Sequence, residues 1–235
     1  MSVSHRNGPL RQSPGRAAFL VVLGVMLALT AVLVVRRSQP AADFGAPPAG
    51  TPIAPTASAA PMVRVPITDG TLPASPGDTA PTRLRIPALD LDATVDAVGI
   101  DAATGDFAVP PSVDRVGWYR YGPGFSADAG SIVIAGHVDS AAQGRGAFFA
   151  LGTLDAGDPV TLTGPGGQTR EFEVVARKRY AKSVVPLQDY FARDGTVRLT
   201  LITCGGPFDP ETRHYRDNVV VTAIGRPAAA RGATR

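Results

Sequence analysis

The chain has 235 residues, with 23 Lys and Arg against 20 Asp and Glu and a formal net charge of +3. Eight of the arginines lie in residues 1–37 and 226–235, which carry no acidic residue, so the remainder holds 15 basic and 20 acidic side chains. The basic character is confined to the two ends, and we expect no nucleic-acid partner. One cysteine cannot form an intramolecular disulfide.

Residues 17–35 contain no charged side chain, and as a helix they would span roughly 28 Å, about the thickness of a bilayer core. This stretch is longer than the apolar region of a cleaved signal peptide. Three arginines precede it and two follow it, which favours a cytoplasmic N-terminus. We therefore expect a cytoplasmic segment 1–16, a single transmembrane helix 17–35 in the cell membrane, and an extracytoplasmic remainder.

The composition changes sharply after the apolar stretch. Residues 38–81 contain ten Pro and ten Ala and little apolar periodicity, which is typical of a stiff, extended linker. We expect a disordered linker over 36–81 and a disordered Ala/Arg-rich tail over 226–235. One folded domain, 82–225, then remains.

The texture of 82–225 is that of an all-β domain. Short runs rich in β-branched residues are separated by Gly, Pro and Asp, and they predict strands at 83–86, 93–100, 131–135, 159–163, 171–177, 196–203 and 218–224. Seven or eight such strands indicate a sandwich or a closed barrel. Apolar spacing predicts one helix over 147–154, and a helical turn is expected around 187–191.

Cys204 follows the predicted strand 196–203 and precedes two glycines. A strand running into a Cys-Gly-Gly turn would place the sulfur at the rim of the sheet, with open backbone around it for a substrate. A lone cysteine is more often a small, buried and inert residue, so this position alone does not establish catalysis.

Two further residues could complete an acyl-transfer site. His137 follows the predicted strand 131–135 after one glycine, whereas His214, the other histidine beyond the apolar stretch, lies in a charged segment that we expect to be a solvated loop. Arg216 precedes the last predicted strand, where its guanidinium could stabilise an oxyanion or pair with Asp217. Nucleophile, proton shuttle and oxyanion donor are the minimum set for acyl transfer.

These residues stand in motifs that resemble those of sortases. Thr200-Leu-Ile-Thr-Cys204 resembles the TLxTC signature of that family, and Ala135-Gly-His137 resembles its histidine motif. Arg216 lies 12 residues after the cysteine, close to where the family carries its arginine. The Cys-Gly-Gly-Pro-Phe-Asp stretch and the His-Tyr-Arg-Asp-Asn-Val-Val-Val ending are similar to actinobacterial class F sortases.

The resemblance implies a closed eight-stranded β-barrel with the active site at one rim. It implies that Cys204 attacks a sorting signal of the LPxTG kind to form a thioester, which an amine of a cell-wall precursor or pilin, or water, resolves. His137 would be the general acid and base, and Arg216 would hold the substrate carbonyl and the oxyanion. Thr203 and the loop residues Val184, Pro186 and Leu187 would line the substrate pocket. No cofactor or metal ion is expected.

Two other classes of function remain open at this point. Peptidoglycan transpeptidases of the L,D-type also depend on Cys and His, but they resemble a Ser-x-Gly-Cys-x-Arg pattern, whereas Gly-Gly-Pro follows Cys204 here. A non-catalytic barrel that binds a wall polymer, with the cysteine buried, is the alternative without chemistry.

Overall fold

A computed structural model describes residues 26, 42–46, 79–101 and 107–226 of the chain. Among residues 1–41 it describes Met26 alone, which is helical. The described residues include no helix that is long and apolar enough to cross a membrane. The expected transmembrane helix 17–35, apart from Met26, lies outside the described residues, as do the segment 1–16, most of the linker and the tail after Arg226.

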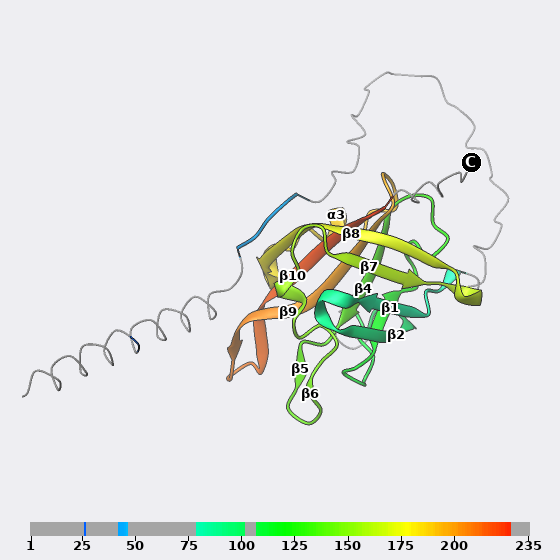
Figure 1. The fold of residues 1–235 in the computed structure, drawn as a ribbon. Coiled ribbons are helices and arrows are strands. Elements are labelled where there is room, and N and C mark those ends of the chain that lie inside the picture. The colour runs from blue at the N-terminus through cyan, green and yellow to red at the C-terminus, as the bar shows by residue number, and fades with distance from the viewer. Residues whose placement is uncertain (1–25, 27–41, 47–78, 102–106, 227–235) are drawn as a thin grey trace, which may run out of the picture. The chain divides into compact units, whose positions relative to one another are not determined.

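Eight strands close into a barrel in the order β1-β2-β3-β4-β9-β10-β8-β7 (Figure 1). Neighbouring strands are antiparallel, except that β2 pairs with β3 and β4 pairs with β9 in parallel. The strands are β1 (Arg83–Ile86), β2 (Leu91–Val98), β3 (Val116–Tyr119), β4 (Ser131–Gly136), β7 (Pro159–Thr163), β8 (Thr169–Ala181), β9 (Arg198–Asp209) and β10 (His214–Gly225). This is the all-β, closed eight-stranded barrel that the resemblance implied.

The remaining elements are short. A two-stranded hairpin pairs β5 (Asp139–Ser140) with β6 (Gly144–Arg145) directly after β4. Four 3₁₀ turns and one α-helical turn connect the barrel strands: η1 (Pro87–Leu89), η2 (Leu151–Thr153), η3 (Pro165–Gly167), η4 (Lys182–Val184) and α3 (Leu187–Tyr190). The turn expected around 187–191 is therefore present as α3.

The barrel interior is filled by alternate residues of its strands, because side chains one residue apart point to opposite faces. In β4, Ile132 and Ile134 belong to the apolar core, and in β9 Leu199 and Leu201 do. All four are fully buried. The positions between them therefore point to the other face of the sheet, and this alternation decides where the reactive side chains emerge.

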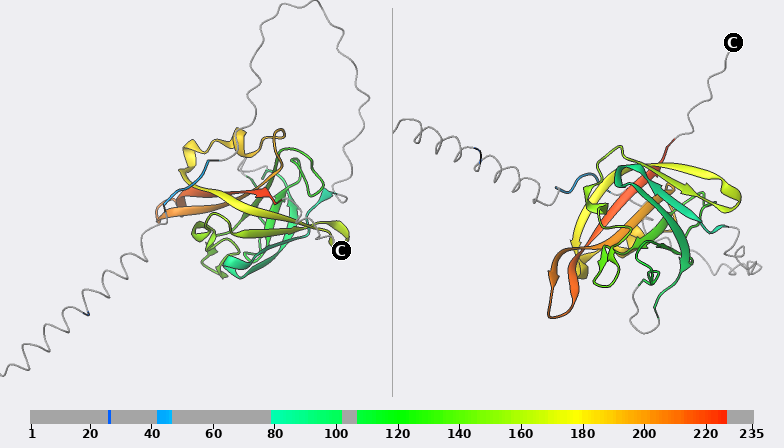
Figure 2. Two further views of the ribbon diagram at one scale, coloured as in Figure 1. Left: turned by 45° about the horizontal axis from the view of Figure 1, so that its top comes forward. Right: turned by 60° about the horizontal axis from the view of Figure 1, so that its bottom comes forward.

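Two expectations about local structure were wrong. The helix predicted over 147–154 is reduced to the single 3₁₀ turn η2, although Phe148, Leu151 and Leu154 are fully buried as their spacing indicated. The strand predicted to end before Cys204 continues through it to Asp209, because β10 keeps pairing with β9 beyond the barrel as far as His214. The resulting β9–β10 hairpin projects from the barrel (Figure 2), so Cys204 lies within a strand and not at its end.

A segment inside the expected linker lies along the barrel. Phe44 forms an isolated antiparallel bridge with Arg177 of β8, with both backbone hydrogen bonds at 3.0 Å. The Asp43 carboxylate accepts the backbone N–H of Arg179 at 3.1 Å, and Nη2 of Arg177 donates to the carbonyl of Ala42 at 2.8 Å. Residues 42–46, which we call the strap, are therefore bonded to β8, whereas the whole linker was expected to be disordered.

Candidate active site

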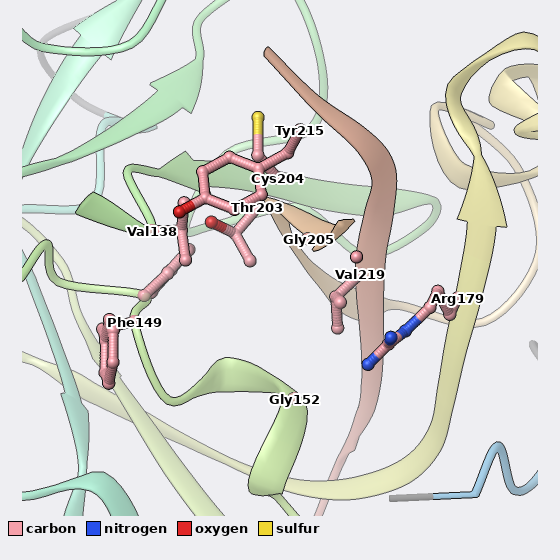
Figure 3. A pocket seen from close by; sticks show the side chains of 11 residues that line it. Val138, Phe149, Gly152, Arg179, Thr203, Cys204, Gly205, Tyr215 and Val219 are labelled. Carbon is pink, nitrogen blue, oxygen red and sulfur yellow. The ribbon is translucent and has the colours of Figure 1, made fainter. Parts of the chain in front are cut away.

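Cys204 lies on the outer face of β9. Because Leu199 and Leu201 point into the core, Thr200, Ile202 and Cys204 share the opposite face. The thiol is free and half-buried. Cys204 lines a pocket of about 260 Å³, together with its neighbours on β9, residues of β10, the loop 148–152 and Arg179 of β8 (Figure 3). Cys204 is therefore accessible, as a candidate nucleophile requires, and is not a buried structural cysteine.

The pairing of β4 with β9 brings His137 next to Cys204. The parallel register runs from Ser131 opposite Arg198 to Ala135 opposite Ile202. The hydroxyl of Thr203 donates to the carbonyl of Gly136 at 2.8 Å, so the two strands still touch one residue further on. Extending the register by one more residue places His137 beside Cys204 on the same outer face.

One ring nitrogen of His137 is already engaged. Its Nε2 lies 2.9 Å from the carbonyl oxygen of Pro110, and since a carbonyl only accepts hydrogen bonds, Nε2 carries a proton. The second nitrogen, Nδ1, is then the one that can take up and release a proton. The Pro110 carbonyl thus fixes both the tautomer and the orientation of the imidazole, which a general base requires.

Arg216 is near the site but does not line the pocket. It belongs to β10, two residues before Asn218, which lies opposite Cys204. A register shift between Tyr215 and Asp217 interrupts the alternation there. The Arg216 side chain is 65% exposed and its Nη2 lies 3.4 Å from Oδ2 of Asp209 on the same hairpin. The pKa of Asp209 is lowered by hydrogen bonds from the backbone N–H groups of Glu211 and Thr212, with a smaller contribution from Arg216.

The residues expected to form the substrate pocket separate into two groups. Thr203 is buried and lines the pocket with Cys204, and its hydroxyl also ties β9 to β4. Val184, Pro186 and Leu187 lie in the η4–α3 loop and do not line this pocket, and Val184 and Leu187 are exposed. That loop is held by the buried Arg198, whose Nη2 donates to the Asp189 carbonyl at 2.7 Å.

Three residues of the site were not singled out from the sequence. Tyr215 and Arg179 line the pocket, and Asp139 accepts a hydrogen bond from Tyr215. Asp139 and Tyr215 each lie within two residues of a motif position, His137 or Arg216, and that proximity was the available signal. Arg179 had none, because only the barrel brings the end of β8 to the pocket. No cluster of three or more His, Cys, Asp or Glu side chains able to hold a metal ion occurs among the described residues.

Comparison with known proteins identifies the family of the folded part of the chain. A family model described as the sortase domain matches residues 84–224. Similar solved structures include a lid mutant of sortase A from Corynebacterium diphtheriae, with 22% identity and a TM-score of 0.48 over 63% of this chain and 70% of that chain. A pilus-related sortase C of Group B Streptococcus has 13% identity and a TM-score of 0.48 over 64% and 69%. Sortase C-1 from Actinomyces oris has 21% identity and a TM-score of 0.46 over 62% and 73%. No curated protein matches the chain in sequence.

Proposed function

The chain belongs to the sortase family of cysteine transpeptidases, and we propose that it is a membrane-anchored, class F-like sortase that cleaves an LPxTG-like sorting signal and transfers the acyl group to an amine of the cell wall or a pilin, or to water. The single observation that carries the proposal is the accessible Cys204 on the outer face of β9, with the His137 loop at the neighbouring register position. The class F assignment is supported by the sequence from Cys204 to Asp209 and from His214 to Val221. Family membership disfavours both the wall-binding barrel and the L,D-type transpeptidase.

In the first step, the sulfur of Cys204 attacks the carbonyl carbon of the Thr–Gly bond in the signal. The Cys204 thiol gives its proton to Nδ1 of His137 as the S–C bond forms, and the departing amine takes that proton from Nδ1 as the C–N bond breaks. The enzyme is then a thioester. In the second step the acceptor amine attacks that carbonyl and gives its proton to His137, so the C–N bond of the product forms and the thiolate is regenerated.

Arg216 is the proposed donor to the oxyanion that forms in both steps. Its present partner is Asp209, and both are on the projecting hairpin, with the arginine side chain largely exposed to water. Exposed ion pairs of this kind contribute little to stability, so exchanging the Asp209 carboxylate for a substrate oxygen is inexpensive. The planar guanidinium then offers two parallel N–H donors, one to the oxygen of the substrate carbonyl under attack and one to a neighbouring acceptor atom of the substrate.

The anchor and the orientation remain part of the proposal. The 19 uncharged residues 17–35 and the arginines before them support a single span with the barrel outside the cell. A fusion of a periplasm- or exterior-dependent reporter after Arg226 should be active in intact cells. Reporter activity only on the cytoplasmic side would reverse the proposed orientation.

The reaction is tested by incubating the full-length chain with an LPxTG peptide and a glycine-based amine, and identifying the products by mass spectrometry. We expect cleavage between Thr and Gly and a covalent acyl-enzyme at Cys204, both absent from the Cys204→Ala variant. Turnover by that variant would refute the assignment of the nucleophile. Arg216→Lys should lower activity steeply because the planar fork is lost. Arg213→Lys, at the tip of the same hairpin, is the matched control, and a larger loss there would mean that the other arginine is the oxyanion donor.

A further inference from the structure

A hydrogen bond joins the loop that carries His137 to the hairpin that carries Arg216. The hydroxyl of Tyr215 donates to Oδ2 of Asp139 at 2.6 Å. Asp139 opens β5 two residues after His137, and Tyr215 is the second residue of β10, directly before Arg216. The bond thus connects the two chain segments that flank the nucleophile, across 76 positions of sequence.

The Tyr215 ring is placed by packing as well as by this bond. It lies opposite Phe208 in the β9–β10 pairing, and the two rings meet edge to face with centroids 5.2 Å apart. The register shift that follows Tyr215 puts the extra residue in β9, between Gly205 and Phe208. The ring lines the pocket beside Cys204, as Figure 3 shows.

The hydroxyl of Tyr215 is a donor over the whole range of physiological pH. Its hydrogen bond to Asp139 raises the pKa of Tyr215 to about 12, together with burial and the negative charges of Asp139 and of an ionised Cys204. A hydrogen bond from a neutral hydroxyl to a carboxylate is short and roughly twice as strong as one between neutral groups. The bond is therefore strong enough to hold a loop in place.

The loop has a specific need for such a bond. The β4–β9 ladder ends at Ala135, so His137 lies beyond the last paired residue of its strand. The Thr203–Gly136 hydrogen bond fixes the residue before His137, and the Pro110 carbonyl fixes the His137 ring. After His137, the carbonyls of His137 and Val138 accept the backbone N–H groups of Phe148 and Gly146. The bond from Tyr215 to Asp139 adds a link from this loop to the β9–β10 hairpin.

We propose that Tyr215 and Asp139 are positioning residues of the transpeptidase site, and that their hydrogen bond holds the His137 loop at the working distance from Cys204. The inference rests on the proposed roles of His137 and Cys204. A displacement of a catalytic group by about 1 Å can cost on the order of 100-fold in rate, so a single loop tether is enough to matter. The tether also fixes the position of the Asp139 carboxylate, and the negative charges of Asp139 and of an ionised Cys204 both act on the Tyr215 hydroxyl.

The experiment compares Tyr215→Phe, which keeps the ring, with Asp139→Asn, which keeps the shape of the acceptor. Both are measured in the full-length chain for kcat and KM with an LPxTG peptide. We expect each to lower kcat about tenfold with less than a twofold change in KM, because the loop is misplaced but the pocket is intact. The double variant should be no worse than the poorer single one, since both remove the same bond. Tyr121→Phe removes an exposed hydroxyl that accepts a hydrogen bond from Arg120 elsewhere on the barrel, and it should leave kcat unchanged.

A second measurement separates positioning from a merely structural role and needs no sorting signal. The rate at which iodoacetamide alkylates Cys204 is followed against pH by mass spectrometry. Tyr215→Phe leaves the Asp139 carboxylate without that donor, so alkylation should require a higher pH. Asp139→Asn removes the negative charge, so alkylation should proceed at a lower pH than in the parent. The other charged or titratable groups around the pocket are the same in every variant: His137, Arg179, Arg216, Asp209 and Asp217.

Opposite displacements of the two alkylation curves, with the fall in kcat, support the proposal. Unchanged kcat in Tyr215→Phe would overturn it. So would a lower melting temperature in both variants with alkylation curves that coincide with the parent's, because that is what a purely structural bond predicts. If the parent itself fails to cleave the peptide, the proposed function fails, and the alkylation curves still decide whether this bond acts on Cys204.

Discussion

Substituting alanine for Gly45 tests whether the strap stabilises the barrel. Gly45 has φ +69°, and a Cβ there would collide with the carbonyl oxygen of Val175 and come within 2.8 Å of the Cα of Ala176. Both are backbone atoms of β8, which cannot move without breaking the barrel. The strap must therefore separate from β8 in Gly45→Ala, and its stabilisation is lost.

The magnitude follows from the contacts that would break. They are two backbone hydrogen bonds between Phe44 and Arg177, one bond from Arg177 to the Ala42 carbonyl and one from the Arg179 N–H to the Asp43 carboxylate. The Arg177 guanidinium also stacks on the Phe44 ring at 4.8 Å. At about 1 kcal/mol for each neutral bond or ring contact and about 2 for each charged bond, these contribute roughly 7 kcal/mol. Ordering five residues costs about 5 kcal/mol, which leaves a net stabilisation of about 2 kcal/mol.

The measurement is the melting temperature of Gly45→Ala against Gly167→Ala. Gly167 has φ +81° and nothing within 4 Å of an added Cβ, so it carries the same left-handed backbone penalty without a clash. Gly45→Ala should melt lower than this control by about 4 to 8 °C for a domain of this size. A chain that begins at residue 47 should show a similar loss, and one that begins at residue 39 should not. Equal melting temperatures of the two alanine variants would refute the claim that the strap supports the barrel.

Three further changes test other parts of the structure. Arg115 lowers the pKa of Asp96 through a hydrogen bond of 2.6 Å, so Asp96→Asn should destabilise the protein at neutral pH. Because the folded-state pKa is the lower one, the difference in melting temperature should persist above the ordinary carboxyl pKa and vanish as pH falls through the lowered value. Thr203→Val removes a buried donor to the carbonyl at the end of β4. The free energy of unfolding from chemical denaturation should fall by about 1–2 kcal/mol, and kcat should fall as well. An unchanged kcat would contradict the idea that this bond positions the end of β4. Arg198→Met removes the donor to carbonyls of the loop 189–196. The KM for the peptide should rise several-fold in steady-state kinetics, while the alkylation rate of Cys204 stays the same. An unchanged KM would show that this loop does not form a wall of the substrate groove.

Most of the barrel strands could be predicted from the sequence because they are local runs rich in β-branched residues and bounded by Gly, Pro or Asp. All seven predicted strands overlap observed strands of the eight-stranded barrel, and the strand predicted at 159–163 has the same bounds as β7. The missing one is β3, Val116–Tyr119, which is short, is nearly all buried and so shows no alternation. It also contains Gly117, which a propensity argument penalises. A Cβ at that position would come within 2.7 Å of Val98 in the neighbouring strand, so glycine is required for β3 to pair there.

The predicted helix over 147–154 failed for a related reason. The apolar spacing was real, since Phe148, Leu151 and Leu154 are fully buried. Spacing of three residues is shared by an α-helix and by successive tight turns, and the loop uses turns. Phe149 is left 44% exposed beneath the Arg145 guanidinium, 4.4 Å from its ring centroid, which places an aromatic edge at the mouth of the pocket.

The candidate catalytic residues differ in how well strand alternation in the sequence predicts their positions: it is sufficient for His137 and Cys204 but not for Arg216. His137 follows β4 and Cys204 lies within β9, and the register of these two parallel strands is set by buried core residues, so correct strands and correct parity are sufficient to bring the two residues to one face. On β10 the same counting from Asn218 would put Arg216 on the face of Cys204 and turn Tyr215 away from it. The pairing shifts register between Tyr215 and Asp217, and in the structure Tyr215 lines the pocket whereas Arg216 lies exposed beside Asp209. A bulge depends on pairing between two strands and leaves no periodic trace in either one. The resting position of the proposed oxyanion donor is therefore a property of the folded hairpin.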